Sequence, residues 1–127
     1  LLLSQQRVNE EGAKHEVKRV LKRIFKDHAK RLVNDLADEH SLEYNKLYIR
    51  DQKTKWGSCS SKDNISLNWR LGFAPKSVIL YTAAHELAHL KHMDHSPAFW
   101  NTVEQLHEDY REAKLWLDQH EHQLHVL

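Results

Sequence analysis

The sequence of 127 residues predicts an α+β domain, and three observations carry that prediction. Residues 5–39 contain no proline and repeat apolar residues every three or four positions, which is typical of an amphipathic helix. Residues 47–51 and 65–70 instead alternate apolar and polar side chains, as half-buried strands do. Residues 75–91 and 97–124 return to helical spacing. We therefore expect a long N-terminal helix, a small antiparallel sheet of two or three strands, and further helices after it.

The first helix should present an apolar stripe to the rest of the domain and a basic face to water. The stripe consists of Val17, Val20, Leu21, Ile24, Phe25, Leu32, Val33 and Leu36. Between residues 13 and 33 eight lysines and arginines face only two acidic residues, whereas residues 104–122 are mainly acidic. Such asymmetry can mark a surface for nucleic acid or another acidic partner, but it is more often a solvated helix face.

The strand-like segments predict a sheet with one buried face. In residues 65–70 the alternation places Ile65, Leu67 and Trp69 on one side and the polar Ser66, Asn68 and Arg70 on the other. Gly57 interrupts another strand-like run, which suggests a bulge or a close approach of the backbone to a neighbour. An edge of this sheet could hold an extended peptide, or the sheet could simply cover the core.

Residues 85–89, His-Glu-Leu-Ala-His, carry the strongest chemical signal. They fall on the helix predicted to run from Pro75 to about Lys91, and residues four apart lie on the same helix face. The imidazoles of His85 and His89 can therefore converge on one ion. The carboxylate of Glu86 lies beside that ion, where it can take a proton from a metal-bound water. This H-E-x-x-H arrangement is typical of zinc peptidases.

A third ligand is needed, and the residues leave alternatives open. His92 is seven residues from His85, about 10.5 Å along a helix, which is too far for easy convergence. His95 is better placed, because Ser96-Pro97 predicts the start of a new helix and hence a turn before it. Glu104 or Glu108 of the following helix are further candidates, since carboxylates also bind zinc.

Other interpretations of the same residues are weaker. Eleven histidines make a chance H-E-x-x-H match easier, but burying two histidines and a glutamate without partners is unfavourable. A purely structural zinc normally has four protein ligands. Ser58 and Cys59 lack the strand-to-helix turn expected of a nucleophile. His120, His122 and His125 alternate in what we expect to be an exposed C-terminal tail without function.

Composition limits the class of protein. The length fits a single domain, residues 1–127. No run approaches the roughly 18 apolar residues of a membrane span, and Leu1-Leu2-Leu3 is too short for a signal peptide. The single cysteine, Cys59, cannot form an internal disulfide, which fits the reducing cytoplasm. We expect a cytoplasmic protein without a membrane partner.

Several separate motifs together resemble one known family. They are residues 55–60 (Lys-Trp-Gly-Ser-Cys-Ser), 65–68 (Ile-Ser-Leu-Asn), 85–89, and 95–100 (His-Ser-Pro-Ala-Phe-Trp). In this order, over residues 47–103, they resemble the YgjP-like zinc metallopeptidase domain. That family is related to SprT-type proteins and is similar to the zincins, in particular the gluzincins. The resemblance implies a zincin-like fold, one Zn²⁺ bound by His85, His89 and His95, and Glu86 as catalytic base. It also implies an edge strand along the substrate cleft, and a chain that lacks the strands that precede the long helix in relatives.

The function expected from these residues is hydrolysis of peptide bonds in a peptide or protein substrate by a metal-activated water, with Glu86 as general base. Tyr81, His107, Tyr110 and the arginines remain open as groups that stabilise the transition state. Two alternatives stand beside this function. One is a zinc-binding interaction module without catalysis, and the other is a nucleic-acid-associated protease of SprT type.

Overall fold

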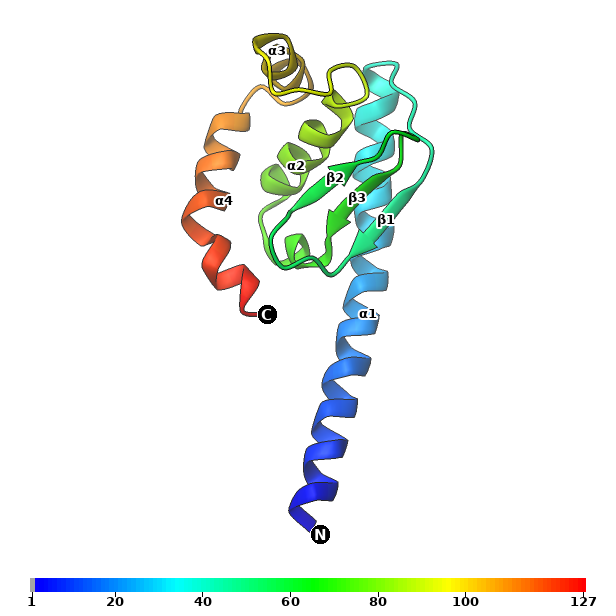
Figure 1. Cartoon of the computed structure of the whole chain (residues 1–127), viewed down its shortest axis with the longest axis vertical. Coiled ribbons are helices and arrows are strands. Elements are labelled where there is room, and N and C mark those ends of the chain that lie inside the picture. Colours follow the sequence, from blue (N-terminus) through cyan, green and yellow to red (C-terminus); the bar gives the residue numbers. More distant parts are fainter. Residues whose placement is uncertain (1) are drawn as a thin grey trace.

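Four α-helices and three short strands make up the described part of the chain, residues 2–127, whose side chains are described from Asn9 onward. In this computed structural model the order is α1 (Leu2–Glu39), β1 (Leu47–Arg50), β2 (Gly57–Cys59), β3 (Ile65–Asn68), a 3₁₀ helix η1 (Trp69–Phe73), α2 (Lys76–Ala88), α3 (Pro97–Leu106) and α4 (Tyr110–His125). Figure 1 shows this arrangement. The predicted α+β class and the long first helix are confirmed. None of the described helices is both long and apolar enough to cross a lipid bilayer.

The sheet is mixed rather than antiparallel, so that part of the prediction is wrong. The strand order is β1-β3-β2. β2 and β3 pair antiparallel across the turn at residues 60–64, with Cys59 opposite Ile65. β1 pairs parallel with β3, with Leu47 opposite Ile65. The reason is the path of the chain: after β1 it crosses to the far edge before β2, so the two strands that run in the same direction become neighbours.

The polar side of β3 is buried, which also differs from the expectation of a solvent-facing side. Ser66, Asn68 and Arg70 are all at most 8% exposed. The Asn68 amide donates to the backbone oxygens of Gln52 (2.6 Å) and Lys55 (2.9 Å), in the segment that crosses from β1 to β2. The crossing segment thus supplies the hydrogen-bond partners that the buried amide of Asn68 requires.

Helix α1 packs on the sheet and on α2 only through its C-terminal half. Phe25, Ala29, Val33 and Leu36 are buried there. The N-terminal part extends away from the other elements (Figure 1), and every described side chain from Asn9 to Val17 is exposed. Val17 and Ile24 were expected in the packed stripe, but they are 56% and 58% exposed.

An ion-pair cluster fixes α1 to the end of β1. The carboxylate of Asp51 pairs with the ammonium of Lys18, and the buried guanidinium of Arg70 donates to it at 2.7 Å. The hydrogen bond from Lys18 holds the pKa of Asp51 well below its usual range, and Arg70 lowers it further. Two of the basic side chains of α1, Lys18 and the more distant Lys22, thus face a carboxylate of the same chain.

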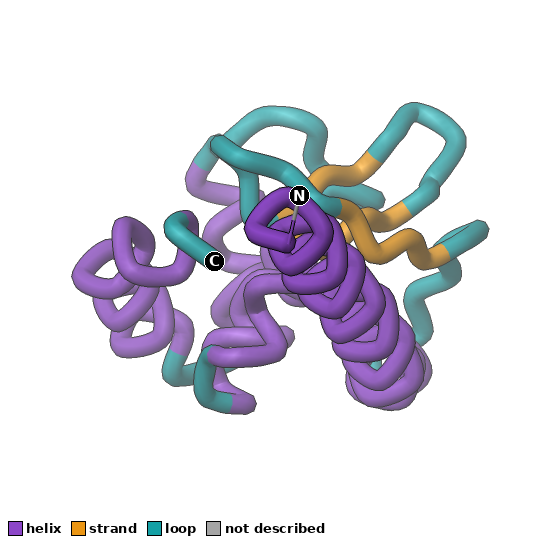
Figure 2. The backbone as a smooth tube through the Cα atoms, turned by 90° about the horizontal axis from the view of Figure 1, so that it is seen from below, coloured by secondary structure: helices purple, strands orange, loops and turns teal. Residues whose placement is uncertain are grey.

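Helix α2 lies at the centre of the fold. It contacts α1, α3, α4, β2 and β3, and nine of its residues are buried. The helices α1 and α2 lie on one side of the sheet, as Figures 1 and 2 show from two directions. A helix that is buried nearly all round holds its side chains in fixed positions. The motif at residues 85–89 therefore sits on the most constrained element.

The C-terminal residues form a packed helix rather than the exposed tail that we expected. Leu117 and Leu124 of α4 are buried against the core. The ring of His125 lies 4.3 Å from that of Trp56, and the ring of His120 stacks on Trp116 at 4.1 Å. Helix α4 thus runs along α2 and reaches back to the start of β2.

Candidate metal centre

His85 and His89 lie one turn apart at the C-terminal end of α2. His85 belongs to the last full turn, and His89 is the residue that caps the helix. The helix ends at Ala88, slightly before the expected Lys91, because the next amides bond to carbonyls three residues back, as in Leu90 to Leu87 at 3.0 Å. This tighter turn preserves the spacing of the two histidines and starts the bend that follows.

His95 is brought back to α2 by the turn at residues 89–96. Ser96 ends that turn, since its hydroxyl accepts a hydrogen bond from the amide of Phe99 at 3.3 Å and caps α3. Pro97 occupies the first turn of α3, where its missing N–H is no loss. The expected cap is therefore present, and it fixes where His95 leaves the loop.

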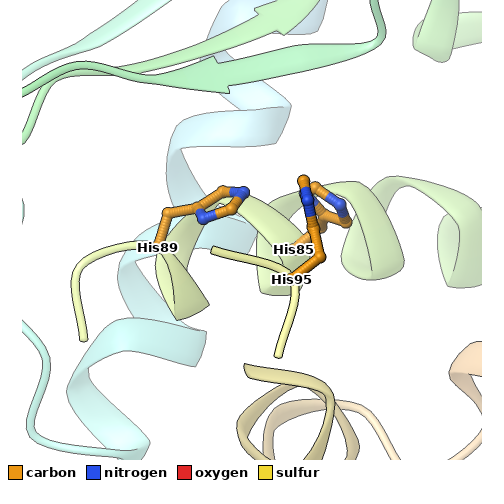
Figure 3. A group of neighbouring side chains, drawn as sticks. All are labelled: His85, His89 and His95. Carbon is orange, nitrogen blue, oxygen red and sulfur yellow. The ribbon is translucent and has the colours of Figure 1, made fainter. Parts of the chain in front are cut away.

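The three imidazoles of His85, His89 and His95 meet in one place (Figure 3). One ring nitrogen from each lies within 4.8 Å of the others. The ring centroids are 5.1 Å apart for His85 and His89, 5.2 Å for His85 and His95, and 4.9 Å for His89 and His95. Among the described residues, neither His92 nor the carboxylates of Glu104 and Glu108 join this group.

Hydrogen bonds orient two of these rings. Nδ1 of His89 lies 2.9 Å from the backbone oxygen of His92, to which it can only donate, so Nε2 remains free for a metal. Nδ1 of His85 lies 3.2 Å from Oε2 of Glu86. His92 thus contributes its carbonyl to the site rather than its side chain, which the spacing of histidines alone could not indicate.

Phe99 forms a buried support for all three rings. It is fully buried, and its ring lies 5.0 Å from His85, 4.5 Å from His89 and 5.0 Å from His95. The sequence predicts Phe99 only as a core residue at helical spacing. Contact with three potential ligands gives it an orienting role as well, because a rigid ring restricts the rotations of its neighbours.

Glu86 is nearly buried and lies against the sheet at Gly57. Its residue is 5% exposed, and a Cβ added at Gly57 would lie 2.9 Å from its Oε2. The same Cβ would lie 2.9 Å from the backbone oxygen of Ser66. The close approach that we expected at Gly57 is therefore present, and the neighbouring group is the carboxylate of Glu86. Only a residue without a side chain fits between β3 and Glu86.

A pocket of about 240 Å³ opens beside His85 and Glu86. Residues 55–57, ahead of and at the start of β2, form one wall and α4 forms the other. Its lining consists of Lys55, Trp56, Gly57, Tyr81, Thr82, His85, Glu86, Lys114, Leu117, Asp118 and Glu121. Several of these lie far apart in the sequence, so the α4 side of the pocket was missed, although the helical spacing of α4 itself was recognised.

The donor set fits a zinc ion. Zinc bonds to histidine nitrogen at about 2.0–2.1 Å, which places two tetrahedral ligands about 3.3–3.4 Å apart. Nitrogens within 4.8 Å of one another need only small side-chain rotations to reach that spacing. Partial burial, and then the neighbouring imidazoles of His85 and His89, lower the pKa of His95, which favours the neutral ring that a metal requires.

The groups considered for stabilising a transition state differ in position. Tyr81 lines the pocket beside His85 and Glu86, and no arginine does. Nε2 of His107 is 3.0 Å from the hydroxyl of Ser77, at the opposite end of α2. Tyr110 is buried and stacks between the rings of Tyr81 and Trp100. Of these candidates, the structure brings Tyr81 to the pocket that borders the motif.

Cys59 does not have the properties of a nucleophile. Burial, followed by the carboxylates of Glu86 and Asp63, raises the pKa of its thiol to about 11. The thiol therefore stays protonated near neutral pH, where a nucleophile needs the thiolate.

A separate cavity of about 170 Å³ between α1 and η1 is lined mainly by apolar side chains and contains none of the three clustered histidines.

Comparison with known proteins gives one family and two similar structures. Residues 1–120 match the family described as the YgjP-like metallopeptidase domain. The metallopeptidase zymogen jannalysin of Methanocaldococcus jannaschii has a similar structure, with a TM-score of 0.63 and 23% identity over 72% of this chain and 94% of that chain. For the zymogen abylysin of Pyrococcus abyssi the TM-score is 0.62, with 24% identity over 72% and 93% of the two chains. No curated protein matches this chain in sequence.

Proposed function

The chain belongs to the YgjP-like metallopeptidase domain family, and on that premise we propose that it is a zinc-dependent peptidase whose metal is held by His85, His89 and His95. One observation supports the proposal most: three imidazole nitrogens lie within 4.8 Å of one another, next to a nearly buried carboxylate at the mouth of a pocket. Three neutral imidazoles leave a fourth zinc position open, as catalytic sites do.

In this proposal Glu86 is the general base and later the proton donor. A bound zinc would lower the pKa of a coordinated water and polarise the carbonyl of the scissile peptide bond. Glu86 then accepts the proton of the attacking water and passes it to the leaving amine. The ring nitrogen of His85 lies 3.2 Å from this carboxylate, and the absence of a side chain at Gly57 leaves room for it.

The substrate of this proposal is an extended peptide. β2 is an edge strand, since the order is β1-β3-β2, and it passes Glu86 at Gly57. Backbone groups on the free side of such a strand can pair with a peptide by main-chain hydrogen bonds. A peptide bound there would run along the pocket between residues 55–57 and α4.

The base assignment is tested with Glu86→Gln, a substitution that keeps the size of the side chain and removes its charge. The purified variant should bind zinc as the wild type does, and its rate of hydrolysis of denatured casein should fall by at least about a hundredfold, the effect expected for loss of general base catalysis. A variant that cleaves casein at the wild-type rate would disprove the role of Glu86. Zinc-loaded wild-type protein without any activity would instead favour the non-catalytic module.

The ligand assignment is tested with His95→Ala, for which His92→Ala is the matched control in the same turn. The first variant should lose zinc during dialysis against a weak chelator, and the second should retain it, since His92 supplies only its carbonyl. Metal content per chain is measured by mass spectrometry. Equal retention by both variants would rule out His95 as a ligand.

A further inference from the structure

The pocket beside Glu86 contains polar groups that the proposed mechanism leaves unused. Tyr81 is 7% exposed and lines the pocket, yet its hydroxyl forms no hydrogen bond with the described residues. Burial, and then the carboxylates of Asp118 and Glu86, raise the pKa of Tyr81 to about 12. Tyr81 packs in the core and also lines the pocket together with both of these carboxylates. The hydroxyl is not one of the fully buried polar atoms that lack a partner among the described residues, so it is open to the pocket and free to hydrogen-bond to a ligand.

The α4 wall carries two carboxylates, Asp118 and Glu121, and one ammonium, Lys114. Asp118 and Glu121 line the pocket, and neither carboxylate forms an ion pair among the described residues. The Lys114 ammonium, which could neutralise Asp118 one turn away, lies instead 5.1 Å from the centre of the Trp100 ring. Lys55 is at the exposed rim and also lacks an ion pair among the residues described. The pocket thus offers two exposed carboxylates of α4 without ion pairs among the described residues, and the hydroxyl of Tyr81.

The opposite wall is aromatic. Trp56 lines the pocket, and no lysine or arginine of the described residues lies over its ring. The cations that do lie over rings are placed over Trp69, Tyr48, Tyr110 and Trp100. Its ring is packed against His125 at 4.3 Å, which fixes its position. An aromatic ring facing carboxylates suits a long side chain with an apolar stem and a cationic end.

We propose that this pocket is a specificity subsite for an arginine or lysine side chain of the substrate, next to the scissile peptide bond, with Asp118 and Tyr81 contacting the cation. The inference rests on the proposed peptidase function for the position of the scissile bond. A volume of about 240 Å³ accommodates one long side chain. The carboxylate of Asp118 supplies the charge, the Tyr81 hydroxyl accepts a hydrogen bond from the cation, and Trp56 covers the alkyl stem. Glutamate at this substrate position would meet repulsion.

Binding measurements test the subsite separately from catalysis. The probes are three fluorescein-labelled octapeptides of alanine and glycine that differ only in a central arginine, norleucine or glutamate. Dissociation constants are measured by fluorescence anisotropy on the zinc-loaded Glu86→Gln variant, which prevents cleavage during the measurement. The arginine peptide should bind about tenfold more tightly than the norleucine peptide, as expected for one partly exposed charge-assisted hydrogen bond. Equal binding of all three peptides would overturn the proposal.

Substitutions on α4 identify the responsible group. Asp118→Asn should reduce the arginine preference to less than about threefold, because the charge that attracts the cation is gone, and Asp118→Lys should reverse it in favour of glutamate. Glu112→Gln is the matched control, because Glu112 is an exposed acid of α4 outside the pocket. Circular dichroism and urea unfolding verify that each variant is folded. An arginine preference that survives Asp118→Asn, or that disappears equally in Glu112→Gln, would show that general charge and not this pocket selects the peptide.

Cleavage profiling separates failure of the subsite from failure of the peptidase. Wild-type protein is incubated with a proteome-derived peptide library, and the new ends are sequenced by mass spectrometry. Arginine and lysine should be enriched at one position flanking the cleaved bond, and Tyr81→Phe should weaken the enrichment while zinc content stays unchanged. Cleavage without this enrichment refutes the subsite alone. A binding preference without any cleavage refutes the peptidase function and leaves the cation pocket standing.

Discussion

Replacing Gly57 by alanine should disturb Glu86 directly. The added Cβ would lie 2.9 Å from Oε2 of Glu86 and 2.9 Å from the backbone oxygen of Ser66. Ordinary van der Waals contacts of a Cβ begin at 3.4 Å, and the oxygen of Ser66 belongs to the central strand, which cannot yield. Gly57 has no positive φ, so alanine introduces no backbone strain. The whole effect must therefore come from these contacts, relieved by moving β2 or by displacing the carboxylate.

The expected loss of stability and activity in Gly57→Ala follows from the overpacking of this site. A forced extra methyl group in a packed site typically destabilises a protein by about 1–3 kcal/mol. A displacement of the base by up to about 1 Å can lower the rate of the chemical step by about a hundredfold. Gly57→Ala should thus lower the free energy of unfolding, measured by urea titration of tryptophan fluorescence, and reduce casein hydrolysis by about 10–100-fold while zinc stays bound.

Two control substitutions test whether the contact with Glu86 causes the effect of Gly57→Ala. Gly12→Ala in α1 meets no atom within 4 Å and should leave activity unchanged while stabilising the helix by about 0.5–1 kcal/mol. In a Glu86→Ala background the contact of Gly57→Ala with the carboxylate is absent, so its destabilisation should be smaller than in the wild type. If the destabilisation is the same in both backgrounds, the approach of Gly57 to Glu86 is not what excludes a side chain.

Three further predictions concern the cluster around Asp51, the support under the histidines and the metal. The pKa of Asp51 is depressed, so its ion pairs stabilise the fold above the unfolded-state pKa near 3.8, and this contribution is lost as the pH falls below it. Asp51→Asn should therefore cost about 1–3 kcal/mol in urea unfolding at pH 7 and much less at about pH 2, and an equal cost at both pH values would contradict the pairing. Phe99→Ala should lower the free energy of unfolding by about 3–5 kcal/mol and weaken zinc retention at temperatures where the variant is still folded. The control is Val103→Ala, which truncates another fully buried residue of α3 and should lower the free energy of unfolding without a specific loss of zinc. Equal loss of zinc in both variants would show that Phe99 does not orient the histidines. Zinc should dissociate as the pH is lowered through the range in which imidazoles protonate, near about 6.5. Zinc affinity that is unchanged at about pH 5, measured by competition with a chelator of known pH dependence, would exclude a site made of three histidines.

Local sequence patterns predicted the parts of this structure that depend on neighbouring residues. Helical spacing placed residues 85–89 at the C-terminal end of α2, and Ser96-Pro97 marked the start of α3. Gly57 signalled a close approach without identifying its partner. These features are readable because periodicity, caps and missing side chains act within a few residues of the chain.

Tertiary structure decided what depends on chain segments distant in sequence. Strand order made β1 and β3 parallel neighbours, and it buried the polar side of β3, where the amide of Asn68 bonds to the segment that crosses to β2. It also left the side chains of Val17 and Ile24 in the first helix mostly exposed.

The candidate site divides in the same way. Its motif, with Glu86 between two histidines, was evident from the sequence alone, and the meeting of His95 with them was one of several open alternatives until the turn at residues 89–96 was placed. The support by Phe99, the contact of Glu86 with Gly57 and the α4 wall with Asp118 could not be predicted. Spacing along one helix fixes directions within that helix, whereas the meeting of separate elements depends on how the whole core packs.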